Sequence, residues 1–107
     1  MPAKIIKILN ELKLGLVSIH GDRLKAVYLF GSFARGEGRL PDSDIDVMVV
    51  LHGDFDTREV EHRSIDFVAN LCLKHEVLIM CHYISEERFA ESQMPFMLNV
   101  RREAVSV

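Results

Sequence analysis

Residues 31–50 read GSFARGEGRLPDSDIDVMVV, and this stretch decides how the chain folds. A glycine-rich turn follows one apolar run, and the next apolar run begins with two aspartates, Asp44 and Asp46, one residue apart. Residues two apart on a strand point to the same face, so the two carboxylates stand together while Ile45 points into the core. Neighbouring carboxylates repel unless a cation lies between them. The pattern therefore predicts a cation site at the mouth of a strand.

Gly31 and Ser32 supply the other half of such a site. They directly follow an apolar run over residues 24–30, and residues 32–36 are expected to form a short helical turn. Glycine lets the backbone approach a ligand, amides at a helix start attract an anion, and the serine hydroxyl adds a hydrogen bond. Magnesium prefers carboxylate oxygens together with substrate phosphates. The two halves together indicate a nucleoside triphosphate bound with magnesium.

A purely structural interpretation of each half stays open. A single Gly-Ser turn is common, and Asp42, Ser43 and Asp44 could instead cap backbone amides where the chain enters the strand. Neither half alone would specify a function.

The rest of the chain predicts one α/β (α+β) domain over residues 1–107, with a short mixed sheet flanked by helices. Apolar residues at helical spacing predict a helix over 3–19, and β-rich runs predict strands over 24–30, 44–51 and 77–84. Helices are expected from Asp56 or Thr57 to about His75, from Ser85, and from Pro95 to about Arg102. The apolar stripe of helix 3–19 is broad enough for deep burial or for a contact between subunits.

Composition narrows the class of protein. The chain is 49% hydrophobic and 27% charged, which is typical of a globular domain, and its net charge of −3 does not favour direct binding of nucleic acid. No apolar run approaches the roughly 20 residues that a membrane helix needs. Cys72 and Cys81 lack metal-site spacing and are expected to be reduced core residues. We expect a cytoplasmic protein.

Considered together, the two halves resemble a known family. The strings GSFARG (31–36) and SDID (43–46) are similar to the GSxARG…SDxD signature of the polymerase-beta-like nucleotidyltransferases. Size and element order resemble the minimal nucleotidyltransferase (MNT) group of small prokaryotic proteins. The resemblance is strong over residues 22–51. Beyond them it rests on element order and on a closing stretch that includes NVRRE (99–103).

The resemblance implies a role for each matching residue. Gly31 and Ser32 would hold the triphosphate of ATP, and Asp44 and Asp46 would bind magnesium, as two ions, and serve as catalytic residues. Arg35 could neutralise phosphate charge, although it could equally pair with Glu37 at the surface. A hydroxyl would attack the α-phosphorus and release pyrophosphate.

The sequence departs from the family where active members carry a third acidic residue. The corresponding strand, EVLIMCHYI (76–84), has no carboxylate in its middle. Glu76 lies at its leading edge and His82 near its far end, and these are the two candidates for the third group. The gap makes catalysis, rather than nucleotide binding, the open question.

Two functions follow from the resemblance. MNT proteins are often antitoxins paired with a helical HEPN-domain protein, and some transfer AMP to a tyrosine of that partner. The first hypothesis is therefore a magnesium-dependent nucleotidyltransferase that modifies such a partner. The alternative is a catalytically weak or inactive protein of the same fold that neutralises its partner by binding. Helix 3–19 would suit either docking to the partner or homo-oligomerisation.

Overall fold

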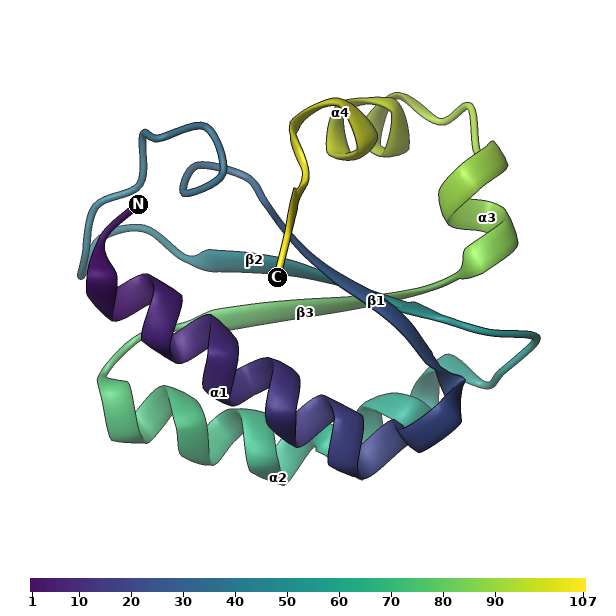
Figure 1. Ribbon diagram of the computed structural model, residues 1–107, viewed down its shortest axis with the longest axis horizontal. Coiled ribbons are helices and arrows are strands. Elements are labelled where there is room, and N and C mark those ends of the chain that lie inside the picture. Colours follow the sequence, from purple (N-terminus) through teal and green to yellow (C-terminus); the bar gives the residue numbers. More distant parts are fainter.

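The computed structural model describes residues 1–107 and confirms an α/β fold in which helices flank a short mixed sheet (Figure 1). The helices are α1 (Ala3–His20), α2 (Thr57–His75), α3 (Glu86–Glu91) and α4 (Pro95–Glu103), and a 3-10 turn spans Gly21–Arg23. The strands are β1 (Leu24–Phe30), β2 (Ile45–Leu51), β3 (Ile79–Ser85) and β4 (Val105–Ser106). No helix is both long and apolar enough to cross a membrane.

The sheet places the two halves of the predicted site next to each other. Its strand order is β3-β2-β1-β4, in which β1 runs antiparallel to β2 and β4, and β2 runs parallel to β3. The end of β1 therefore meets the start of β2, and Phe30 pairs with Asp46. Gly31 follows Phe30 directly, so the glycine turn and the aspartates share one end of the sheet.

The two faces of the sheet are covered unequally. In Figure 1, α1 and α2 lie below the sheet, and α3 and α4 lie above it. The lower face carries the larger core, in which alternate residues of β2 (Ile45, Val47, Val49 and Leu51) are completely buried. The upper face carries a smaller cluster that joins Phe30, Met48 and Val50 of the sheet to Met97 and Val100 of α4.

Capping side chains mark the starts of two helices, α2 and α3, where the sequence predicts them. The Asp56 side chain accepts a hydrogen bond from the Arg58 amide at the start of α2, and Ser85 accepts one from the Arg88 amide at the start of α3. Pro95 occupies the first turn of α4, where its missing N–H costs nothing.

Three expectations needed correction. Residues 32–36 form hydrogen-bonded turns rather than a helix, because the Ser32 carbonyl accepts from both Glu37 and Gly38 and closes the chain into a tight loop. The third strand begins at Ile79 rather than at residue 77. The short strand β4 was not predicted at all, and it pairs with Tyr28 and Leu29 of β1.

Candidate active site

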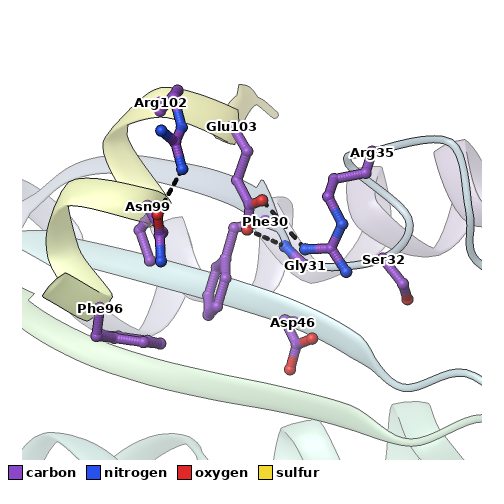
Figure 2. A pocket seen from close by; sticks show the side chains of 10 residues that line it. Phe30, Gly31, Ser32, Arg35, Asp46, Phe96, Asn99, Arg102 and Glu103 are labelled. Carbon is purple, nitrogen blue, oxygen red and sulfur yellow. Dashed lines mark hydrogen bonds and ion pairs between the residues drawn. The ribbon is translucent and has the colours of Figure 1, made fainter.

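A cleft of about 560 Å³ lies above the point where β1 ends and β2 begins (Figure 2). The sheet and its turn supply one wall, and α4 supplies the other. Its lining residues are Phe30, Gly31, Ser32, Arg35, Asp46, Phe96, Asn99, Val100, Arg102 and Glu103. Four of the residues that the sequence nominated, Gly31, Ser32, Arg35 and Asp46, therefore meet in one cavity.

Gly31 is required by both its backbone and its surroundings. Its φ of 76° lies in the left-handed region, which side chains with a Cβ rarely adopt. The Asp46 carboxylate also lies over its Cα, so that a Cβ at position 31 would collide with Oδ2 of Asp46. Glycine here lets the carboxylate and the backbone amide reach the same cleft.

Asp46 is a half-buried carboxylate without a hydrogen-bond donor of its own among the described contacts. Burial raises its pKa, and the nearby charges of Asp44 and Glu103 raise it further, while His82 and Arg35 act in the opposite direction. The charged form of Asp46 is therefore disfavoured in the protein alone. A bound cation would reverse this balance.

Asp44 is the residue immediately before β2 and is exposed. It does not line the cleft, but it is close enough to influence the pKa of Asp46. No group of three or more His, Cys, Asp or Glu side chains is arranged to hold a metal ion. Two carboxylates suit magnesium better than most metals, because this ion completes its coordination with water and substrate phosphates. The donor set therefore fits magnesium that arrives with a nucleotide.

The position beside Asp46 on the neighbouring strand belongs to Met80, not to an acid. Paired residues of adjacent strands share a face, so Met80 stands where a third carboxylate from β3 would be closest to Asp46. His82 lies two residues further along the same face, and its ring packs against Phe30 and Phe96 at centroid distances of 5.5 and 6.2 Å.

Glu76, the other candidate for the third group, lies outside the cleft. It is the exposed residue that ends α2 in a left-handed conformation, before β3 begins. Of the two candidates, only His82 approaches Asp46 closely enough to affect its pKa.

Five residues of α4 line the cleft, and sequence reasoning did not assign them to the site: Phe96, Asn99, Val100, Arg102 and Glu103. Phe96 remains 52% exposed although it contacts Phe30 edge-on. Asn99 accepts a hydrogen bond of 2.6 Å from Arg102. Residues 96, 99, 100 and 103 follow the helical i, i+3, i+4, i+7 spacing of one face, which is the signal that could have identified all of them except Arg102.

Glu103 makes the most direct contact across the cleft. Its Oε1 accepts a hydrogen bond of 3.0 Å from the Gly31 amide, and its Oε2 pairs with Nη1 of Arg35 at 3.1 Å. Partial burial alone would raise the pKa of Glu103, but the bonds from Gly31 and Arg35 outweigh it and the pKa lies below its ordinary value. Arg35 also pairs with Glu37 at 2.9 Å, so the expected surface pairing of these two residues is confirmed. Its role toward phosphate stays a prediction.

Comparison with known proteins identifies similar proteins over most of the chain. The family model of the nucleotidyltransferase domain matches residues 4–103. Two proteins of Methanocaldococcus jannaschii, each named "Putative protein adenylyltransferase", are similar to this chain. One is 34% identical over 76 residues, covering 71% of this chain and 75% of the relative. The other is 39% identical over 83 residues, covering 78% and 76%.

Solved structures share the fold at lower identity. The crystal structure of a "putative nucleotidyltransferase from Sulfolobus solfataricus" superposes with a TM-score of 0.58 at 21% identity, covering 99% of this chain and 86% of that one. A toxin-antitoxin structure with AMP-PNP gives a TM-score of 0.59 at 18% identity, covering 91% of this chain and 69% of that one.

Proposed function

Because the chain belongs to the nucleotidyltransferase domain family, we propose that it is a magnesium-dependent enzyme that transfers AMP from ATP to a partner protein. The observation that carries this proposal is the cleft itself. A backbone amide, a serine and an arginine that suit phosphate oxygens lie beside Asp46, with Asp44 next to it. This is the chemistry that a nucleoside triphosphate with magnesium requires.

The proposed reaction forms a bond between an acceptor oxygen and the α-phosphorus and breaks the bond to the β-phosphate oxygen, so that pyrophosphate leaves. Gly31, Ser32 and Arg35 would bind and orient the β- and γ-phosphates, with Arg35 balancing part of their charge. Asp44 and Asp46 would hold magnesium, as two ions. When bound, magnesium stabilises the attacking and leaving oxygens of such a displacement.

The charges of the cleft support the need for a cation. The negative side chains are Asp46 and Glu103, which line the cleft, and Asp44, which lies close by. The positive side chains that line it are Arg35 and Arg102. A triphosphate entering alone would meet net negative charge, which opposes binding. Magnesium removes this repulsion, so we expect nucleotide affinity to depend strongly on it.

A protein acceptor is supported by the two relatives named "Putative protein adenylyltransferase" and by the toxin-antitoxin structure with AMP-PNP that shares the fold. We propose a helical HEPN-domain protein as the partner, and one of its tyrosines as the acceptor. Ile6, Leu14 and Val17 of α1 are between 47% and 73% exposed, so the broad apolar stripe of this helix is only partly used within the chain. This surface could dock the partner or a second copy of the chain.

One observation favours the alternative function, a module that binds and neutralises its partner without turnover. Met80 occupies the position beside Asp46 on β3, so this strand contributes no third carboxylate to the cleft. A methionine in place of a third carboxylate would impair catalysis more than nucleotide binding, because the proposed phosphate-binding residues lie on the turn after β1 and not on β3.

Calorimetric titration of non-hydrolysable ATP, with and without magnesium, tests the binding site. We expect magnesium-dependent binding that Asp44→Asn/Asp46→Asn abolishes. The matched control is Asp54→Asn/Asp66→Asn, which removes the same charge at two exposed positions away from the cleft and should bind as the wild type does. Transfer of label from ATP to a co-expressed partner then tests catalysis.

The four outcomes of these experiments separate the hypotheses. Binding with transfer supports the enzyme, and binding without transfer supports the neutralising module. If the protein did not bind nucleotide even at millimolar concentration, the cleft would be neither the active site of an enzyme nor the nucleotide site of a neutralising module. A double variant that is much less stable than the wild type would instead indicate that Asp44 and Asp46 are structural caps.

A further inference from the structure

Glu103 holds the two donors that a phosphate group would use. The Gly31 amide and the Arg35 guanidinium each donate to a different oxygen of its carboxylate, at 3.0 and 3.1 Å. A carboxylate with two charge-assisted bonds is a close chemical substitute for a phosphate with two of its oxygens bound. Figure 2 shows this carboxylate between α4 and the turn that carries Gly31.

We propose that Glu103 is a competing internal ligand that sets the affinity of this cleft for phosphate. The proposal rests on the proposed function, because it names the residue that a nucleotide must displace. In the nucleotide-free protein the Glu103 carboxylate occupies the phosphate position. A triphosphate with magnesium takes over the Gly31 amide and Arg35, and the carboxylate turns away from them.

The position of Glu103 permits this exchange. It is the last residue of α4, so its side chain can leave the cleft without disturbing the interior of the helix. The side chain is 20% exposed, and water is therefore at hand to solvate the carboxylate once it is released. Arg102, whose charge already acts on Glu103, lies beside it and can continue to balance its charge.

With a competing ligand, the apparent affinity equals the intrinsic affinity multiplied by the fraction of molecules in which the site is free. If the Glu103 contact is formed in about nine molecules of ten, removing it should raise the affinity for phosphate about tenfold. A residue that instead held the loop in its binding-competent shape would have the opposite effect, since its loss would weaken binding.

Glu37 provides the matched control. It pairs with the same arginine, Arg35, at 2.9 Å, but it makes no contact with the Gly31 amide and its side chain is 65% exposed. Glu37→Ala therefore removes an equal charge from the same guanidinium without freeing the amide. A general electrostatic effect would appear in both variants, whereas competition for the phosphate position would appear in Glu103→Ala.

The test is calorimetric titration of magnesium tripolyphosphate and of non-hydrolysable ATP into the wild type, Glu103→Ala, Glu103→Gln and Glu37→Ala. We expect Glu103→Ala to bind both ligands about tenfold more tightly, and Glu37→Ala to change affinity less than about twofold. Glu103→Gln keeps an acceptor for the Gly31 amide, so its gain should be intermediate. Thermal unfolding of each variant checks that it is folded.

Each result decides between the proposals. Unchanged or weaker binding by folded Glu103→Ala and Glu103→Gln, with normal binding by the wild type, overturns the role of Glu103 and leaves the proposed function intact. Equal gains in the Glu103 and Glu37 variants also overturn it. Failure of every variant to bind either ligand overturns both proposals. Binding by Glu103→Ala with none by the wild type would support competition in its strongest form.

Discussion

The two faces of the sheet differ in what they contribute, although β2 supplies residues to both. On the lower face Ile45, Val47 and Val49 are completely buried in the core that the sheet forms with α1 and α2. On the upper face the same strand presents Asp46, which is half-buried in a cleft. The alternation of a strand thus lets one seven-residue segment hold the core together on one side and carry the chemistry on the other.

The lengths of the helices explain the difference. The lower face is covered by helices of 18 and 19 residues, whereas the upper face has helices of 6 and 9 residues. The short helices bury only part of their side of the sheet and leave the cleft open beside Gly31. We infer that stability resides mainly on the lower face and binding on the upper face.

Leu12→Ala should give the largest effect on stability. Leu12 is completely buried in the lower core, and truncation of such a leucine costs about 2–5 kcal/mol of unfolding free energy. Chemical denaturation measures this loss. Below the unfolding transition, nucleotide affinity should stay unchanged, because Leu12 does not line the cleft.

The control for this variant lies on the same helix. Leu14 is 73% exposed, and Leu14→Ala should change stability by less than about 0.5 kcal/mol. If folded Leu12→Ala bound nucleotide much more weakly than Leu14→Ala did, the separation between the two faces would not hold.

Gly31→Ala should have a moderate effect on stability and a larger one on binding. The positive φ makes any side chain there cost about 1 kcal/mol or more. The new Cβ also pushes the Asp46 carboxylate from its place, so we expect nucleotide affinity to fall at least about tenfold, or roughly 1.4 kcal/mol.

Gly36→Ala separates the effect of backbone strain from the effect of displacing the Asp46 carboxylate. Gly36 has nearly the same φ, 77° against 76°, but no atom lies within 4 Å of the Cβ that the substitution would add. Both variants should lose similar stability in denaturation, and only Gly31→Ala should lose binding in calorimetry. Equal binding losses would mean that the strain of the turn, rather than the displacement of Asp46, controls the cleft.

The difference between the two faces also explains which helices and strands could be predicted from the sequence. Long periodic patterns identified α1 and α2, and β-rich runs identified the three main strands, because the lower core requires continuous apolar faces. The two-residue strand β4 was missed, since Val105 and Ser106 are too few to form a pattern. Residues 32–36 were expected to be helical, but backbone bonds to the Ser32 carbonyl favour a tight turn.

The sequence allowed site residues to be identified only where they lie close to one another along the chain. Gly31, Ser32, Arg35 and Asp46 meet in one cleft because β1 and β2 are consecutive antiparallel strands. Glu103 could not be placed there from local spacing, because its contact with Gly31 spans 72 residues. The roles of these residues in catalysis and metal binding stay predictions.

His20 should give a smaller effect than Leu12 or Gly31, and it belongs to the lower face. Its ring is buried at the end of α1 against Tyr83, and neither ring nitrogen has a hydrogen-bond partner. Burial lowers its pKa below 6.5, and the charges of Arg23 and Arg63 lower it further. The unfolded chain therefore takes up a proton more readily than the folded one as the pH falls below about 6.5.

The neutral form of His20 thus contributes stability that is present above pH 6.5 and is lost as the pH falls through the lowered pKa. We expect a loss of less than about 1 kcal/mol between pH 7.5 and 5.5, measured by chemical denaturation. His20→Leu should remove this loss, whereas His62→Gln, a change at an exposed histidine of α2, should retain it. An unchanged loss in His20→Leu would assign the pH dependence to other groups.

Asp46 on the upper face should respond to pH with the opposite sign. Its pKa is raised, so the folded chain takes up this proton first, and the penalty for its charge is present at neutral pH and relieved as the pH falls. Without magnesium, Asp46→Asn should therefore raise stability at pH 7.5, by only about 0.5 kcal/mol because solvent screens a half-buried carboxylate. The gain should shrink on acidification, while that of His20→Leu grows. Opposite trends in these two variants would show that one face is optimised for stability and the other for a ligand that the protein alone does not supply.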